Sequence, residues 1–256
     1  MVVSGSPRKV VGRRAVTGTE RGLDLLLILL ASPVIVLVGG LIALAVFADS
    51  PGPILYRARR IGKDGRPFRM LKFRKMRREA AGPILTRHDD ERFTPIGRFL
   101  AVTKLDELPQ VWNVITGEMR LVGPRPEVEE FIKLYGEEYR EILKVLPGIT
   151  GLAQLRYAGE SQLFGDAHDS SLLYKERILP EKIALDLRYI ASRSLLGDMA
   201  IVLATAMLPL TALRARLALR LRVRFIPPRR LPGYALLALV VLAMVGAFAV
   251  QAASPY

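Results

Sequence analysis

The sequence contains no cysteine and only two histidines among its 256 residues. Without cysteine, a disulfide framework, a zinc site built from thiolates and a cysteine nucleophile are all excluded. The two histidines, His88 and His168, are too few and too far apart in the chain for a histidine metal cluster. Any catalytic chemistry must therefore rest on carboxylates, hydroxyls and basic groups.

Acidic residues are scarce beside basic ones, with 24 Asp and Glu against 38 Lys and Arg and a formal net charge of +14. This excess suits anionic lipid headgroups, small polyanionic substrates or nucleic acid. Nucleic acid is disfavoured because the basic residues are not interleaved with an aromatic stacking platform, and Trp112 is the single tryptophan. We therefore expect anionic membrane lipids and small polyanions as partners, and no nucleic acid.

Apolar residues make up 51% of the chain and gather in long runs. Residues 23–48 are interrupted by few polar side chains and exceed the ~20 residues that a spanning helix needs. Both flanks are basic, so the positive-inside rule places both ends in the cytoplasm. Because proline disrupts helical hydrogen bonding, Ser32-Pro33 favours a re-entrant membrane helix-hairpin that returns to the face it entered. A kinked spanning helix and a cleaved signal peptide are the alternatives.

A second apolar run, residues 234–253, is uncharged and of spanning length. Because an arginine-rich stretch precedes it, we expect a C-terminal transmembrane helix with Tyr256 facing out. Residues 195–213 are apolar but contain Asp198 and Pro209, and they lead into alternating Arg and Leu. This pattern predicts an amphipathic helix on the membrane surface, with a second spanning pass or a buried core helix as alternatives.

Most charged residues lie between the apolar runs, where turn signals divide the chain. Residues 54–59 and 68–73 flank Asp64-Gly65 and predict a β-hairpin, whereas residues 127–146 have the apolar spacing of a helix. With few and short strands, we expect a helix-dominated α+β fold. The predicted organisation is a basic leader (1–20), the re-entrant helix (21–49), a small cytoplasmic catalytic domain (50–194), an amphipathic basic segment (195–230) and a C-terminal transmembrane helix (231–256).

The most informative motif is the carboxylate pair Asp106-Glu107, which is followed closely by Pro109. Because proline favours the first turn of a helix, we expect the pair at a helix N-terminus, where unpaired N–H groups attract phosphate. An ionised aspartate there can attack phosphorus, while the neighbouring glutamate holds Mg²⁺ against a diphosphate. Thr103-x-x-Asp106 also fits a capping box, so a purely structural role is the alternative.

Basic residues in the neighbouring motifs are candidate phosphate ligands, because Arg and Lys clamp diphosphates through charge-assisted hydrogen bonds. These candidates are Lys72, Arg74, Arg98 and Arg125. The alternative is a solvated basic face against anionic lipid. Residues 156–175 form a candidate specificity loop, or else a polar connection.

Several motifs follow one another in a fixed order within residues 20–205. They include Lys72-Phe73-Arg74, Ile96-Gly97-Arg98, Leu105-Asp106-Glu107-Leu108-Pro109-Gln110, Gly123-Pro124-Arg125-Pro126 and Pro147-Gly148-Ile149-Thr150-Gly151. In this order the motifs resemble those of the bacterial sugar transferases, the monotopic phosphoglycosyl transferases that start surface-glycan assembly.

The resemblance implies transfer of a phosphosugar from a nucleoside diphosphate sugar, usually a UDP-sugar, to a polyprenyl phosphate. It implies that Asp106 is the nucleophile of a ping-pong reaction, that Glu107 binds Mg²⁺, and that Ser32-Pro33 breaks a re-entrant helix. The expected location is the bacterial inner membrane, with the catalytic domain on the cytoplasmic face, and a homo-oligomer is compatible with this. The rival hypothesis is a membrane-tethered basic scaffold module without catalysis.

The chain departs from the family pattern close to the carboxylate pair. Where the family commonly has Arg-Lys, this chain has Ala101-Val102, and Lys75 replaces a usual threonine. One expected anion contact is therefore missing, and Lys104 is a candidate replacement for it.

Overall fold

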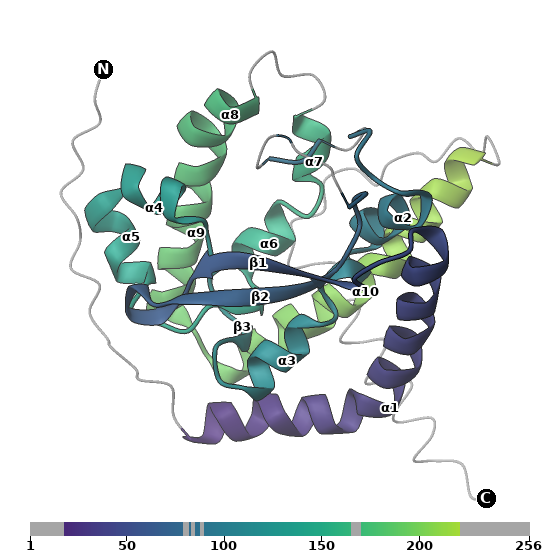
Figure 1. Ribbon diagram of the computed structural model, residues 1–256. Coiled ribbons are helices and arrows are strands. Elements are labelled where there is room, and N and C mark those ends of the chain that lie inside the picture. The colour runs from purple at the N-terminus through teal and green to yellow at the C-terminus, as the bar shows by residue number, and fades with distance from the viewer. Residues whose placement is uncertain (1–17, 79–81, 83–84, 88–89, 165–169, 221–256) are drawn as a thin grey trace, which may run out of the picture. The chain divides into compact units, whose positions relative to one another are not determined.

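The computed structural model describes residues 18–78, 82, 85–87, 90–164 and 170–220 (Figure 1). The C-terminal helix predicted at 231–256, both histidines and most of the basic leader lie outside these residues. The chain divides into two compact units, Met1–Pro209 and Leu210–Tyr256, and the site described below belongs to the first.

The first element, α1 (Gly18–Asp49), is a helix of 32 residues that contains Pro33. Figure 1 shows that α1 changes direction between its two halves. The Ser32 hydroxyl donates to the Leu29 carbonyl oxygen at 2.7 Å, so the turn before the proline has an additional hydrogen bond. By length and composition α1 could cross a membrane, and most of its large apolar side chains are exposed. A re-entrant course for α1 stays a prediction.

The predicted hairpin is confirmed. The strands β1 (Leu55–Ile61) and β2 (Pro67–Phe73) pair antiparallel, and the 3₁₀ turn η1 (Lys63–Gly65) joins them. Its turn contains two consecutive left-handed residues, Asp64 at φ 57° and Gly65 at φ 74°. The hairpin matters for the site because Lys72 lies near the end of β2 and Lys75 lies two residues after the strand.

The remaining elements are mostly short helices, so the helix-dominated α+β class is confirmed. They are α2 (Pro95–Thr103), η2 (Leu105–Glu107), α3 (Gln110–Ile115), β3 (Arg120–Val122), α4 (Glu129–Leu134), α5 (Gly136–Ile142), β4 (Gly148–Thr150), α6 (Leu152–Arg156), α7 (Glu160–Leu163), α8 (Ser170–Leu173), the π-helical turn η3 (Tyr174–Ile178), α9 (Leu179–Ser192) and α10 (Leu195–Arg220). The prediction of one helix over residues 127–146 is wrong. Two helices, α4 and α5, meet there because Gly136 adopts φ 28°, which lies outside helical geometry.

The strands β3 and β4 form a short parallel pair that the sequence analysis did not predict. Their approach requires glycine, because a Cβ atom on Gly148 would lie 2.0 Å from the backbone nitrogen of Gly123. The Gly123 N–H donates to the Thr150 carbonyl oxygen at 2.8 Å. This contact fixes the start of the loop that carries Arg125.

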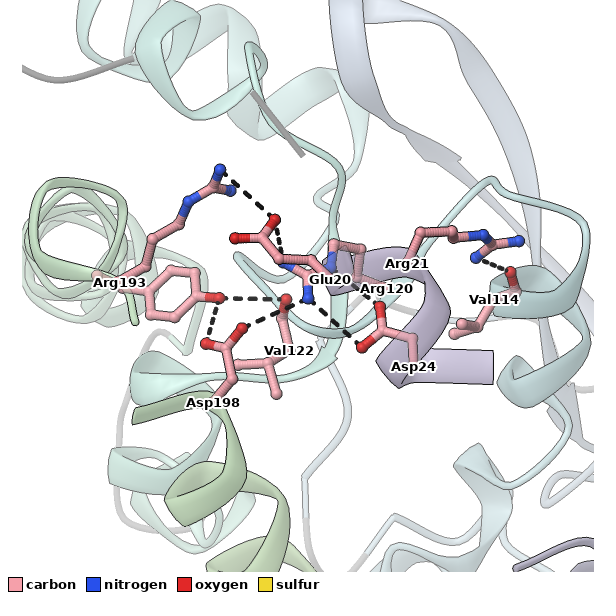
Figure 2. A network of polar contacts seen from close by, with 9 residues as sticks. Glu20, Arg21, Asp24, Val114, Arg120, Val122, Arg193 and Asp198 are labelled. Atoms are coloured by element: carbon pink, nitrogen blue, oxygen red, sulfur yellow. Dashed lines mark hydrogen bonds and ion pairs between the residues drawn. The ribbon is translucent and has the colours of Figure 1, made fainter. Parts of the chain in front are cut away.

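A buried network of charges joins α1 to the rest of the first unit (Figure 2). Arg120 of β3 is 2% exposed, and its Nε lies 3.0 Å from Asp24 Oδ2 of α1. Its Nη1 lies 3.3 Å from Glu20 Oε2, and its Nη2 lies 3.4 Å from Asp198 Oδ2 of α10. Tyr189 of α9 donates to Asp198 Oδ1 at 2.8 Å. The first turns of α1 and α10 are therefore fixed to the same strand.

Candidate active site

The carboxylate pair lies in η2, the 3₁₀ turn between α2 and α3. The helix α2 ends at Thr103, and the left-handed backbone of its C-cap Lys104, at φ 61°, turns the chain into η2. The pair thus precedes α3, whose N-cap is Pro109, rather than lying in the first turn of that helix. The capping box is not formed, because the Thr103 hydroxyl donates backward to the Phe99 carbonyl oxygen at 2.9 Å. Capping therefore does not explain the two adjacent carboxylates.

Glu107 is held by two cations that the sequence analysis singled out. Its Oε1 accepts from Lys72 Nζ at 2.9 Å and from Arg125 Nη2 at 2.6 Å, and its Oε2 accepts from Arg125 Nη1 at 3.2 Å. Burial by itself would raise the pKa of Glu107, but the charges of Arg125 and Lys72 outweigh it and hold this pKa well below its ordinary value. Burial lowers the pKa of Lys72 to about 8, although Glu107 opposes the shift. Glu107 therefore carries a full negative charge at neutral pH.

Asp106 is 1% exposed and has a different environment from Glu107. Lys75 Nζ lies 3.0 Å from its Oδ2. Neither oxygen has a hydrogen-bond partner within the described part of the chain, and Oδ1 has no ion pair there either. A buried carboxylate oxygen without a partner is costly to maintain, so it is a candidate for contact with a ligand.

The pair faces a polar cleft of about 170 Å³. Eight Lys and Arg side chains and four Asp and Glu side chains line this cleft, so its charge favours a polyanion such as a diphosphate. Arg98, which is exposed on α2, and Lys104 are among these residues. Burial lowers the pKa of Lys104, and Glu107 acts in the opposite direction.

Arg74 lies apart from the other predicted phosphate ligands. Its guanidinium donates to the Ser50 carbonyl oxygen after the end of α1, and it is not among the residues that line the polar cleft. The structure thus brings Lys72, Arg98 and Arg125 to one cleft with the carboxylate pair. A role for Arg74 in phosphate binding stays a prediction.

A larger, mostly apolar cleft of about 380 Å³ adjoins the polar one. Its wall includes Ile35 of α1, Ile149 of β4 and Val202 of α10. Glu107 and Arg125 line both clefts, so the two spaces meet at the carboxylate pair. The site can therefore accommodate a charged ligand on one side and an apolar chain on the other.

The helix α9 supplies charged residues that the sequence analysis missed. Lys182 Nζ pairs with Glu160 and lies 4.9 Å from the centroid of the Tyr174 ring. Asp186 lines the apolar cleft, and burial raises its pKa to about 8, with a further contribution from Glu127. A signal existed in the sequence, because positions 179, 182, 183 and 186 share one face of a helix and two of them are charged.

The residues around the pair have the donor chemistry that Mg²⁺ prefers, since carboxylate oxygens are its usual protein ligands. The Glu107 carboxylate, the predicted Mg²⁺ ligand, is the candidate donor from the pair. Within the described residues no group of three or more His, Asp or Glu is placed to hold a metal ion, so substrate phosphates and water would complete the coordination. Both oxygens of Glu107 already accept from cations, and a metal ion would displace at least one of these contacts.

The order of motifs, the carboxylate pair and the basic cleft define a class of protein. Residues 15–212 match the family model described as "Bacterial sugar transferase", and this chain belongs to that family. The resemblance drawn from the motifs is thus confirmed.

Similar proteins include two that are named "UDP-glucose:undecaprenyl-phosphate glucose-1-phosphate transferase". The one from Escherichia coli strain K12 is 37% identical over 209 residues, which cover 78% of this chain and 41% of that protein. The one from Caulobacter vibrioides is 39% identical over 202 residues, which cover 75% of this chain and 70% of that protein. A third relative is the Aeromonas hydrophila "UDP-N-acetylgalactosamine-undecaprenyl-phosphate N-acetylgalactosaminephosphotransferase". It is 35% identical over 204 residues, which cover 77% of this chain and 45% of that protein. The chain thus spans less than half the length of the first and third of these relatives.

Proposed function

We propose that this protein transfers a phosphosugar from a nucleoside diphosphate sugar of the UDP-sugar class to a polyprenyl phosphate, and so initiates the assembly of a surface polysaccharide. The observation that carries the proposal is a buried aspartate, Asp106, with a free oxygen in a basic cleft that meets an apolar cleft. The relatives support it, since their names state UDP-sugars and undecaprenyl phosphate as substrates.

In the first half of the reaction, the donor diphosphate lies in the polar cleft against Lys72 and Arg125. Asp106 Oδ1 attacks the phosphorus that carries the sugar, and a new O–P bond forms. The bond from this phosphorus to the oxygen of the nucleoside monophosphate breaks, and the electron pair leaves with that oxygen. Mg²⁺, when bound at Glu107, would neutralise part of the diphosphate charge. The product is a covalent aspartyl phosphosugar.

In the second half, the polyprenyl phosphate enters by the apolar cleft. Its phosphate oxygen attacks the same phosphorus, and the bond to Asp106 breaks, which returns the carboxylate. The polyprenyl diphosphate sugar then leaves. The contact of the two clefts at Glu107 and Arg125 supports this order, because both substrates can reach one phosphorus atom from different sides.

The proposed location is the bacterial inner membrane, with the catalytic domain on the cytoplasmic face. The support is α1, whose apolar side chains are exposed and whose flanking sequences are both basic. A re-entrant course that turns at Ser32-Pro33 would keep both ends of α1 on the side of the catalytic domain. Anionic lipids would then contact the basic flanks.

The direct test is the Asp106→Asn variant, assayed with a panel of UDP-sugars and a short polyprenyl phosphate. We expect release of nucleoside monophosphate to fall about 10³-fold or more, since a nucleophile is removed. Mass spectrometry of donor-treated wild type should show a phosphosugar on Asp106, and the variant should show none. The matched control is Asp64→Asn, an exposed aspartate in η1.

Two results would count against the proposal. An Asp106→Asn variant that releases nucleotide at the wild-type rate would exclude the covalent mechanism. Binding of polyanions without turnover of any donor by the wild type would instead favour the scaffold hypothesis.

A further inference from the structure

Among the residues that the structure describes, Lys75 forms the ion pair with the proposed nucleophile. Its Nζ lies 3.0 Å from Asp106 Oδ2, whereas Lys72 and Arg125 contact Glu107. The Lys75 side chain is 26% exposed and the Asp106 side chain 1%, so the ion pair closes over a buried carboxylate at the wall of the polar cleft. Neither Asp106 oxygen has a hydrogen bond within the described residues, but Oδ2 is in the ion pair with Lys75, so Oδ1 is the oxygen left for attack.

The backbone of Lys75 is held tightly by α2. A Cβ atom on Gly97 would lie 1.8 Å from the Lys75 carbonyl oxygen, so the helix can approach this closely only with glycine at that position. The Thr94 N–H donates to the same oxygen at 3.1 Å. The Lys75 ammonium also lies 5.8 Å from the centroid of the Phe93 ring. These contacts direct the side chain toward Asp106.

Two residues of α2 near the nucleophile are uncharged, although Arg98 and the C-cap Lys104 also line the polar cleft. Ala101 and Val102 line the same polar cleft as Lys75 and Asp106, and neither carries a charge. These are the two positions where the family commonly has Arg-Lys. The contact with Asp106 comes instead from the segment that follows β2.

Resting on the proposed phosphosugar transfer, we propose that Lys75 is a catalytic residue of this chain, which orients Asp106 and then binds the phosphoryl group. Before the attack, Lys75 pairs with Oδ2 and leaves Oδ1 facing the donor. As the Oδ1–P bond forms, negative charge leaves the carboxylate, and the P–O bond to the nucleotide breaks with its electron pair. The Lys75 ammonium then donates to a phosphoryl oxygen and keeps its own proton throughout.

This role requires Lys75 to interact more strongly with the phosphoryl group in the transition state than with Asp106 in the resting enzyme. Only an interaction that is stronger in the transition state accelerates the chemical step. The flexible four-carbon side chain of lysine allows the ammonium to move from the carboxylate to the phosphoryl group. Its partial exposure leaves space on the cleft side for that movement.

The test compares Lys75→Met and Lys75→Arg in the full-length, membrane-embedded protein. Single-turnover formation of the phosphosugar adduct on Asp106 is followed by quenching and intact-mass spectrometry with a UDP-sugar that the wild type accepts. We expect Lys75→Met to slow adduct formation about 10²-fold, as for loss of one preorganised donor, with a smaller change in KM for the donor. Lys75→Arg should recover to within about tenfold of wild type, because it retains the charge. The matched control is Lys63→Met, at an exposed position in η1. This substitution should change neither the rate of adduct formation nor the KM for the donor.

A second variant tests whether the position of the charge can be moved. Lys75→Thr combined with Ala101→Arg and Val102→Lys places the cations on α2, and we expect adduct formation faster than in Lys75→Thr alone.

A thermal unfolding midpoint like that of wild type shows that each variant is folded. A folded Lys75→Met that forms the adduct at the wild-type rate would overturn the proposal. Failure of the wild type itself to form an adduct would refute the proposed function instead.

Discussion

Two buried clusters of charge in the first unit have similar composition and different hydrogen bonding. One is centred on Arg120, which contacts carboxylates from α1 and α10 (Figure 2). The other is the pair Asp106-Glu107 with its lysine and arginine partners. Both join elements distant in sequence, and both hold carboxylates that are largely removed from water.

The difference lies in the atoms that lack a partner. In the described part of the chain, no buried side-chain atom of Arg120, Asp24 or Asp198 lacks a hydrogen bond, whereas both carboxylate oxygens of Asp106 do, and Oδ1 has no ion pair either. The Arg120 cluster borders neither described cleft, and the Asp106 cluster borders the polar one. Burial of charge alone therefore does not indicate a catalytic site. An unpartnered oxygen at the wall of a cleft is the more informative sign.

The largest expected effect on stability comes from breaking the Arg120 cluster. Arg120→Met leaves three buried carboxylates without their shared cation, so we expect a loss of about 3–5 kcal/mol in unfolding free energy. Denaturant unfolding in detergent, followed by tryptophan fluorescence, measures it. Arg59→Met, an exposed arginine on β1, is the control. A loss below about 1 kcal/mol would show that the cluster is not structural.

A smaller effect should come from Asp186, a buried carboxylate in the apolar cleft. Its pKa is raised to about 8 from 3.8, so the folded state binds a proton that the unfolded state releases. The contribution to stability is present at low pH and is lost as pH rises through about 8. From pH 6 to pH 8 the unfolding free energy of wild type should fall by roughly 2–3 kcal/mol more than that of Asp186→Asn. Parallel pH profiles for the two proteins would contradict this.

The smallest effect on stability should come from the site itself. Asp106→Asn removes a charge with one ion-pair partner and one free oxygen, so we expect a change within about 1 kcal/mol of wild type in either direction. The same denaturant experiment measures the unfolding free energies of Asp106→Asn and Arg120→Met for comparison. If Asp106→Asn were as destabilising as Arg120→Met, the two clusters would not differ as described.

Local patterns predicted the parts of the structure that depend on near neighbours. The hairpin followed from two strand-like runs around Asp64-Gly65. The motifs predicted Lys72 and Arg125 as phosphate ligands near the carboxylate pair, but not their contacts with Glu107. The prediction of a single helix over 127–146 was wrong because the apolar spacing continues across Gly136, whereas the helical backbone is interrupted there.

Contacts between distant segments could not be predicted in this way. The pairing of Lys75 with Asp106 depends on the close approach of α2 to the chain after β2, which Gly97 permits. The contact of Arg120 with Asp24 joins residues 96 positions apart. Such contacts depend on packing geometry, which a pattern of residue types along the chain does not specify.

The wall shared by the two clefts has a consequence for how the reactants meet. Under the proposed reaction, Glu107 and Arg125 first face a ligand dissolved in water and later one dissolved in lipid. Because the sugar phosphate stays attached to the protein between the two events, neither reactant has to cross into the solvent of the other. The bond between Asp106 and phosphorus forms as the nucleotide leaves and breaks as the lipid phosphate attacks, so it holds the sugar phosphate at the membrane boundary while one reactant replaces the other.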